Sequence, residues 1–316
     1  MRRLVGIGAC YLDTILCVPQ YPSEDEKLRA SSLTTRRGGN CPNTLEVLDD
    51  LIQHSGIPVA LDLIAVLPSR ESSATAKIEA SLKPGVSLQA CLFREDYQEP
   101  PSSYIIKNAA SGSRTIINYN ELPEMTCDEF SRAVDMLNTE GTWYHFEGRI
   151  PDVTLQCITH LRKSHVNARI SVELEKPGRH GLQELVPEAD VVFYSKSWAI
   201  GNGYHDPEEC LQAQAKVASN ALLLCCTWGE EGSHALEPAT NNYCRTAASL
   251  PEGSSVVDTV GAGDTFIAGV LYTFLYEHKA WSIPQRLAFA NRLAGFKVSQ
   301  EGFSGLSRYM QLQKEE

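Results

Sequence analysis

The sequence predicts an α/β fold in which a mostly parallel central sheet lies between two layers of helices. Short apolar runs typical of buried strands alternate along the chain with longer segments that have helical periodicity. Such alternation covers both faces of a parallel sheet with helices, and ligands then gather beyond the carboxyl ends of the strands. A chain of 316 residues with 21% charged side chains has the size and composition of a globular protein of this class.

The expected core strands are the short apolar stretches, and the clearest is the run Ala221-Leu-Leu-Leu-Cys-Cys. A continuous apolar run of this length is typical of a strand that is buried on both faces. By the same criterion, core strands are expected at residues 4–9, 59–66, 142–146, 170–174, 191–194 and 222–227.

The expected helices show apolar residues at helical spacing and recognisable ends. The helix from Asn40 to His54 is followed by Gly56, a residue that commonly ends helices. Near the C-terminus, Phe266, Val270 and Phe274 recur every four residues and form part of a broad buried stripe. Helices are therefore expected at residues 40–54, 128–138, 152–164, 207–219, 264–278 and 284–299.

Two regions interrupt this alternation. Residues 11–36 and 90–120 have the pattern of antiparallel hairpins, the second with a turn at Ser111-Gly112. Together they could form a small sheet, either a lid that excludes water from a reaction site or a structural edge without a catalytic role. We expect a single domain, residues 1–316, with a β lid built from about residues 11–36 and 90–120.

The stretch Asp258-Thr-Val-Gly-Ala-Gly-Asp264 gives the strongest indication of chemistry. Gly261, Ala262 and Gly263 directly precede the striped helix, so their amides lie at its positive end and can bind an anion. Asp264 adds a carboxylate that suits this place if it acts on a neutral hydroxyl. An anion site beside a base is what phosphoryl transfer to an alcohol needs. The alternative is a glycine turn whose acidic residue only stabilises the helix start.

A second group of polar residues suits a neutral polyol. Asp13 can accept hydrogen bonds from hydroxyl groups, whereas Asn40 and Asn43 can both donate and accept them. Gly38 and Gly39 would let hydroxyl groups approach the backbone. Each side chain also has a structural interpretation, because either asparagine could cap a helix and an isolated aspartate is often a turn residue.

Several other functions are disfavoured. The net charge of −11 argues against general binding to nucleic acid or anionic membranes. No Gly-Lys pair is present, which removes a Walker-type phosphate loop, and the sequence has no His-Arg-Asp or Asp-Phe-Gly of a protein kinase. The stretch Gly6-Ile-Gly8 lacks the third glycine of a dinucleotide-binding fingerprint.

The chain has the features expected of a cytoplasmic protein. The apolar stretch after Met1-Arg-Arg is too short for a signal peptide, and no apolar run reaches membrane-spanning length. The ten cysteines include no Cys-x-x-Cys pair, so we expect buried reduced thiols rather than disulfides or a zinc site. The eight histidines show no ligand spacing, and we assign them no chemistry.

A series of motifs along nearly the whole chain gives a family resemblance. In order they are Asp13, Gly38-Gly39-Asn40-x-x-Asn43, Ser111-Gly-Ser-Arg114, His145-Phe-Glu147-Gly-Arg149, Ser171-Val-Glu173-Leu-Glu175, Trp228-Gly-Glu-Glu-Gly232, the stretch 258–264 and Gly302-Phe-Ser-Gly305. The series resembles the PfkB-type, or ribokinase-like, carbohydrate kinases and, among them, the ketohexokinase (fructokinase) branch. The resemblance implies a ribokinase-like three-layer α/β domain with a small β-sheet lid. It also implies ATP-dependent phosphorylation of a primary hydroxyl of a ketose, with fructose 1-phosphate as the expected product.

The resemblance also implies roles for individual residues. Asp264 would be the catalytic base, and Arg114 would reach from the lid toward the transferred phosphoryl group. The sugar-binding residues would be Asp13, Gly39, Asn40, Asn43 and Asp264. The ATP-binding residues would be Arg114, Gly229, Glu230, Glu231, Gly232, Gly261, Ala262 and Gly263. No direct metal ligand is assigned, although Glu173 and Glu175 could order magnesium through water.

The resemblance further implies ATP and Mg²⁺ as cofactors and leaves a requirement for K⁺ open. It implies a homodimer whose lids interlock, with Asp25 placed to contact the sugar of a partner subunit. Cys41, where the family usually has a smaller residue, could crowd or reshape the sugar pocket. Alternative activities are phosphorylation of ribose, another sugar or a nucleoside, and an alternative of a different class is a non-catalytic sensor of sugar or nucleotide.

Overall fold

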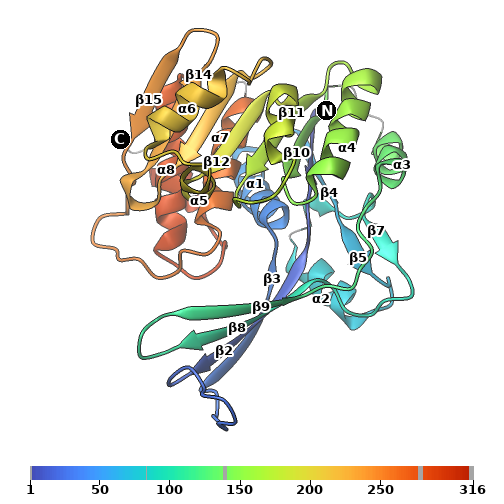
Figure 1. The fold of residues 1–316 in the computed structure, drawn as a ribbon, viewed down its shortest axis with the longest axis vertical. Helices are drawn as coiled ribbons and strands as arrows, with labels where there is room; N and C mark the ends of the chain where they lie inside the picture. Colours follow the sequence, from blue (N-terminus) through green and yellow to red (C-terminus); the bar gives the residue numbers. More distant parts are fainter. Residues whose placement is uncertain (1, 83, 138–140, 277–279, 313–316) are drawn as a thin grey trace.

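The computed structural model describes residues 2–82, 84–137, 141–276 and 280–312. Its main element is a large sheet, with a smaller sheet projecting from it (Figure 1). The strands of the large sheet are β1 (Arg2–Ile7), β4 (Val59–Ile64), β6 (Val86–Ser87), β10 (Trp143–Glu147), β11 (Arg169–Leu174), β12 (Val191–Ser195), β13 (Leu223–Thr227), β14 (Ser233–Glu237) and β15 (Asn242–Thr246). The six predicted core strands are confirmed, with ends displaced by one or two residues.

The strand order of the large sheet is β15-β14-β13-β12-β11-β10-β1-β4-β6. All neighbouring pairs from β13 to β6 are parallel, whereas β14 and β15 extend the sheet as an antiparallel edge. The predicted, mostly parallel sheet is therefore confirmed. The antiparallel edge was not predicted, because polar residues such as His234 and Asn242 interrupt its apolar pattern.

Helices cover both faces of this sheet and form the outer two of three layers (Figure 1). One face packs on α1 (Asn40–Ser55), α7 (Ala262–Leu275) and α8 (Ile283–Val298), and the other on α3 (Cys127–Leu137), α4 (Pro151–Ser164) and α6 (Pro207–Ala215). Adjacent strand residues alternate between the two cores: Cys225 belongs to the first and Cys226 to the second. Burial on both faces explains why the parallel strands are continuous apolar runs in the sequence.

The six predicted helices are confirmed in the described residues, except that α6 ends at Ala215 and not at residue 219. Residues 138, 277 and 278, which the predictions also included, lie outside the described residues. The helix ends follow local chemistry. Gly56 ends α1 in the left-handed region at φ 67°, where its N–H donates to the carbonyl of Ile52 at 2.8 Å. Shorter elements were not predicted, because little local periodicity marks them. They are α2 (Ser73–Ser81), α5 (Lys196–Gly201), α9 (Arg308–Leu312), the 3₁₀ helices η1 (Leu182–Glu188) and η2 (Gly229–Glu231), and the paired strands β5 (Val66–Pro68) and β7 (Leu92–Arg94).

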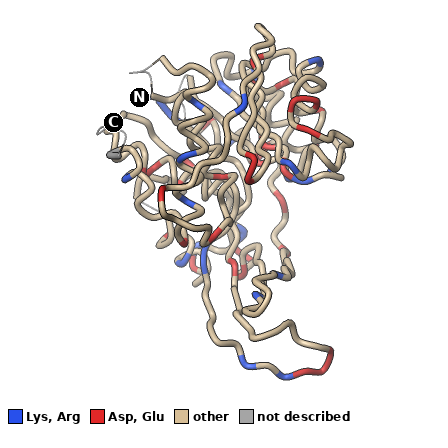
Figure 2. Tube along the Cα trace, turned by 90° about the vertical axis from the view of Figure 1, so that its left-hand side faces the viewer, with Lys and Arg blue, Asp and Glu red and all other residues tan. Residues whose placement is uncertain are grey.

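The smaller sheet consists of two hairpins lying side by side. Its strands are β2 (Tyr11–Val18), β3 (Ser32–Gly38), β8 (Ser102–Asn108) and β9 (Arg114–Tyr119), in the order β3-β2-β8-β9. Each hairpin is antiparallel, and the parallel pairing of β2 with β8 joins them. The expected second hairpin starts only at Ser102, because residues 92–94 pair with β5 instead. The sheet and its loops stand away from the main body (Figures 1 and 2).

The remaining sequence expectations concern thiols and membranes. All ten cysteines carry free thiols, and seven of them are buried. Within the part of the chain that the structure describes, no helix is long and apolar enough to cross a membrane.

Candidate active site

A cavity of about 650 Å³ lies between the large sheet, the start of α7 and the base of the smaller sheet, the predicted lid formed by β2, β3, β8 and β9. Residues at the carboxyl ends of parallel strands form its floor: Glu147 ends β10, Glu175 follows β11, Ser195 ends β12 and Thr227 ends β13. Ligands in α/β folds gather at this edge because the chain leaves the strands there and its loops carry polar groups. This cavity is therefore the candidate active site.

One face of the lid forms a wall of this cavity. Asp13 lies opposite Arg36 on one side and Ser103 on the other, and Ser103 lies opposite Asn118. Residues directly opposite each other share a face of a sheet, and Asp13, Ser103 and Asn118 all line the cavity. Burial raises the pKa of Asp13, although the Ser103 hydroxyl and the Arg36 guanidinium oppose this effect.

Arg36 connects the lid with the segment that leads into α7. Its Nε lies 4.0 Å from Asp13 Oδ2, and its Nη1 lies 3.5 Å from Asp258 Oδ2. Asp258 also accepts a 2.9 Å hydrogen bond from Lys297, whose side chain is fully buried. This chain of charges holds the lid strand and the glycine-rich segment in one arrangement.

The Gly-Ala-Gly segment begins α7, as the sequence predicts. Gly261 is the N-cap residue with φ 78°, and a Cβ there would lie 2.3 Å from Phe303 Cζ. Gly261 and Gly263 line the cavity, and a Cβ on Gly263 would meet no atom within 4 Å. The amides of the first helical turn have no partner within a helix, and the absence of side chains at the two glycines leaves this turn uncovered. Of these amides, the N–H of Ala262 donates to the carbonyl of Thr259 at 3.3 Å. The segment thus has the properties of an anion site.

Asp264 lies inside the cavity wall and is only 7% exposed. Its Oδ2 accepts a 2.7 Å hydrogen bond from Asn43 Nδ2. Burial raises the pKa of Asp264 to about 7, since the Asn43 amide and Arg37 only partly offset burial and the repulsion from Glu175 and Glu147. A carboxyl group with a pKa near neutrality is suited to accept a proton from a substrate hydroxyl.

Asn43 lies within α1, where Arg37 fixes its orientation. Its Oδ1 accepts a 2.9 Å hydrogen bond from Arg37 Nη1, and Arg37 also pairs with Glu46. With one amide hydrogen donated to Asp264, Asn43 keeps one N–H for a ligand. The alternative in which an asparagine caps the helix is wrong, since the N-cap residue is Gly39 and no side chain caps the helix.

Gly39 is required by the packing of the backbone. It has φ 110°, a conformation that L side chains rarely adopt, and a Cβ there would lie 2.1 Å from the carbonyl oxygen of Ala9. This contact sets the start of α1 against the connection between β1 and β2. Gly39 and Asn40, the first residue of α1, therefore reach the cavity wall beside Asp13.

Asn40 lies beside a group of three carboxylates. Its Nδ2 donates to Glu173 Oε1 at 3.0 Å and to Glu175 Oε2 at 3.2 Å, which leaves its Oδ1 as an acceptor. Glu147 Oε2 accepts a 3.0 Å hydrogen bond from the N–H of Ala9. Burial raises the pKa of Glu147, and it raises the pKa of Glu173 well above its ordinary value. Glu173 Oε2 is buried without a hydrogen-bond partner, so a cation or water could be accommodated there.

Two predicted site residues on the lid do not line the cavity. Arg114 is exposed at the start of β9. By strand alternation it shares a face with Ile116 and Asn118, but it lies about 13 Å along the strand from Asn118. Asp25 lies in the loop between β2 and β3, exposed and with φ 61°. Neither side chain belongs to the cavity wall in this conformation.

The predicted nucleotide residues after β13 lie beside the cavity rather than in its wall. Gly229, Glu230 and Glu231 form η2, and Gly232 follows with φ 103°. Glu231 lies 3.4 Å from Lys196 Nζ. Thr227 connects this turn with the cavity lining. Ala262 lies between the two lining glycines of α7 without lining the cavity itself.

Sequence reasoning missed several residues of the site. Lys176 and Arg179 line the cavity, as do Glu147, Ser103 and Asn118. Their position after a predicted strand could have indicated Glu147 and Lys176. No sequence pattern marks Ser103 and Asn118, because the register of the paired strands decides that they face the cavity.

Cys41 does not crowd the cavity directly, whereas an effect of Cys41 on the shape of the sugar pocket stays a prediction. Cys41 is fully buried, and its Sγ lies 3.2 Å from the carbonyl oxygen of Ile7. It does not line the cavity.

Comparisons with known proteins agree with this arrangement. The family model described as pfkB family carbohydrate kinase matches residues 1–307. Ketohexokinase from Mus musculus is 32% identical and aligns over 96% of this chain and 99% of its own length. Among solved structures, ribokinase from Arabidopsis thaliana complexed with ribose and ATP has a TM-score of 0.75 at 20% identity, covering 95% of this chain and 93% of its own. Phosphofructokinase-2 from Escherichia coli in complex with fructose-6-phosphate has a TM-score of 0.74 at 17% identity and covers both chains completely.

The structural likenesses establish the ribokinase-like fold, and the match along the sequence establishes the family. Membership implies ATP as the phosphoryl donor. The chain belongs to the pfkB family of carbohydrate kinases and is a sugar kinase.

Proposed function

We propose that this protein transfers the γ-phosphoryl group of ATP to the 1-hydroxyl of fructose. The observation that carries the proposal is the position of Asp264, whose buried carboxylate shares one cavity with Asp13, Asn40 and the start of α7. The similarity to a ketohexokinase over nearly the whole length of both chains supports a ketose as the acceptor. The same cavity thus offers a sugar site, a base and an anion site.

The sugar is held by polar groups of the wall that can still accept or donate hydrogen bonds. Asp13 accepts hydrogen bonds from two hydroxyls, Asn40 Oδ1 accepts another, and the second N–H of Asn43 donates one. Gly39 allows the sugar to approach the backbone. Hydroxyl groups that pair with buried polar atoms confer specificity, because an analogue without one leaves its partner unpaired.

Asp264 removes the proton from the attacking hydroxyl, and Asn43 holds the carboxylate in place for this step. Bound ATP supplies the γ-phosphoryl group, and Mg²⁺ neutralises charge on the phosphates. The first-turn amides of α7 stabilise negative charge that develops on the phosphoryl oxygens. Arg114 contributes a forked donor when the lid closes. Closure also excludes water from the cavity.

The residues present fit a nucleotide and a magnesium ion. Gly261 and Gly263 leave space at a helix N-terminus, and the turn from Gly229 to Gly232 extends the site beyond Thr227. Lys176 and Arg179 offset part of the negative charge of the surrounding carboxylates. Glu173, with its unpartnered oxygen, and Glu175 would order water around Mg²⁺.

We also propose that two copies associate through their lids. Tyr104 and Ile117 lie opposite each other on the lid face turned away from the cavity and are 47% and 56% exposed. Leu33 and Tyr119 are exposed on the same face by strand alternation. An apolar patch of this kind is suited to an interface. In this arrangement Asp25 reaches the sugar of the partner subunit.

The decisive experiment is a panel of fructose, ribose, other ketoses and nucleosides with ATP and Mg²⁺, with and without K⁺, followed by ADP release. NMR then locates the phosphate on the product. We expect turnover of fructose with the phosphate on O1. Turnover of ribose or a nucleoside without fructose would reject the ketose assignment and retain the kinase, whereas binding without any turnover would favour a sensor.

A further inference from the structure

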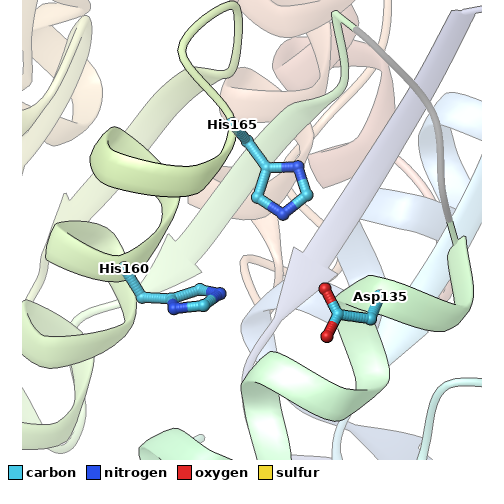
Figure 3. Close-up of side chains that lie close together, drawn as sticks. All are labelled: Asp135, His160 and His165. Atoms are coloured by element: carbon cyan, nitrogen blue, oxygen red, sulfur yellow. The ribbon is translucent and has the colours of Figure 1, made fainter.

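A group of three metal-ligating side chains lies outside the active site. Asp135 is on α3, His160 is on α4, and His165 is the C-cap residue of α4. Each offers one ligand atom, and these atoms all lie within 4.8 Å of one another. Figure 3 shows both imidazole rings and the carboxylate turned toward a common space. None of the three residues lines the sugar cavity.

Neighbouring contacts position His165, whereas a ring nitrogen of His160 has no hydrogen-bond partner. The backbone N–H of His165 donates to the carbonyl of Leu161 at 2.7 Å, which fixes the backbone of His165 at the end of α4. The His165 ring also packs against Tyr144, with 6.5 Å between the ring centroids. His160 Nε2 is buried and has no hydrogen-bond partner. A buried nitrogen in this state needs a partner, and a bound cation would provide one.

The geometry requires only a small contraction to bind an ion. The ring centroids of His160 and His165 are 6.2 Å apart, whereas two imidazoles on one tetrahedral ion would be about 5 Å apart. Asp135 is exposed, so its side chain can rotate toward the histidines. The negative end of the α4 dipole lies nearby and favours a cation. Arg162 is a basic residue of the same helical turn, and its charge is paired with Asp190 at 3.0 Å.

We propose that Asp135, His160 and His165 bind one Zn²⁺ ion and thereby clip α3 to α4. Two imidazole nitrogens and one carboxylate oxygen are ligands that Zn²⁺ prefers, and water would complete a tetrahedral site. Mg²⁺ favours oxygen ligands in octahedral geometry and suits this group poorly. Because α3 follows β9 in the chain, the clip anchors the helix that comes after the last lid strand. Its role is to stabilise the fold, separate from phosphoryl transfer.

The test is a titration of the full-length protein with Zn²⁺ alone, after treatment with EDTA and with the cysteines kept reduced. We expect one ion to bind per chain and the melting temperature to rise. His160→Gln and Asp135→Asn should each weaken Zn²⁺ binding by at least about 10-fold. Loss of a residue that only orients a metal ligand already has an effect of this size, and loss of the ligand itself should have no smaller one. His205→Gln is the matched control, because this histidine is exposed and outside the group.

The melting temperatures of the metal-free variants check their folding. Asp135→Asn is less prone to disturb folding than His160→Gln, because Asp135 is exposed. Substitution of Co²⁺ for Zn²⁺ should give the visible absorption of a four-coordinate site in the wild type and in His205→Gln. Equal Zn²⁺ affinity in the wild type and His160→Gln would place any bound ion outside this group, for example on thiols or on the carboxylates of the active site, and overturn the proposal. A wild type that binds no Zn²⁺ would overturn it as well.

Discussion

At the scale of single residues, the proposed function depends on the environment of Asp264. Asp264→Asn preserves the shape of the side chain and its contact with Asn43 but removes the carboxylate that we propose as the base. Turnover should fall by about 10²–10⁴-fold, the range for loss of a general base, while nucleotide affinity measured by calorimetry stays unchanged. Near-normal turnover would remove Asp264 from this role.

The melting temperature at a pH above the pKa of Asp264 shows whether this variant is folded. The raised pKa of Asp264 means that the folded protein binds this proton more tightly than the unfolded chain. The resulting stability is present below the ordinary aspartate range and is lost as the pH rises toward about 7. Asp264→Asn should therefore melt at the same temperature as the wild type or higher at pH 8.

A second prediction concerns the pH dependence of the reaction. The active form of Asp264 is the carboxylate, so kcat/KM for the sugar should rise with pH through a midpoint of about 7. Asn43 lowers the pKa of Asp264 through its 2.7 Å hydrogen bond. Asn43→Ala should thus move the midpoint to higher pH and raise the KM for the sugar more than the KM for ATP. An unshifted profile would show that the amide does not control the base.

At the scale of secondary-structure elements, the prediction is that the smaller sheet acts as a lid and brings Arg114 into the reaction. Arg114 is exposed at the far end of the lid face that forms the cavity wall. If it binds the phosphoryl group on closure, Arg114→Lys should lower kcat about 10-fold or more, because a forked donor is lost while the charge is kept. Steady-state kinetics of Arg132→Lys, a change at an exposed residue of α3, provide the control. Equal kinetics of both variants would mean that Arg114 stays in solvent and does not bind the phosphoryl group.

The start of α1 gives a prediction about stability. Gly39→Ala combines a left-handed backbone with a clash against the carbonyl oxygen of Ala9. Gly56→Ala serves as its control, since φ there is also positive but no atom lies within 4 Å of the added Cβ. Urea unfolding should show a loss of about 1–2 kcal/mol for the control and a larger loss for Gly39→Ala. Equal losses would mean that the backbone near Ala9 relaxes freely.

At the scale of the whole molecule, the prediction concerns a dimer formed through the lids. Ile117→Lys places a charge on the exposed apolar face of β9. We expect the wild type to sediment as a dimer and this variant as a monomer at the same concentration. A wild-type monomer would reject the dimer, and an unaffected dimer would place the interface elsewhere.

Mixed subunits test whether Asp25 acts across the interface. Asp25→Asn and Asp264→Asn should each be impaired alone. After the two variants are mixed and reassociated, activity should partly return, because one site in a mixed dimer combines an intact Asp264 with the Asp25 of the other subunit. No recovery would show that Asp25 does not serve the neighbouring site.

The sequence alone determined the alternation of strands and helices and the start of α7 at Gly261-Ala-Gly. These features are local: apolar runs, helical spacing and glycines near helix ends reflect backbone sterics and burial over a few residues. The ordered motifs also indicated the family, because they extend along nearly the whole chain. Position relative to the strand ends then predicted where the cavity would lie.

Only the tertiary structure decided which side chains share the site. The row of Asp13, Ser103 and Asn118 depends on the register of β2, β8 and β9, which pairs residues far apart in the chain. The contacts of Asn43 with Arg37 and Asp264, and thus the raised pKa, likewise require α1 to pack beside α7. Asp135 and the two histidines of α4 gave no spacing signal, since the approach of two helices brings them together. Long-range contacts of this kind follow from packing of the whole chain, whereas sequence periodicity reports only local order.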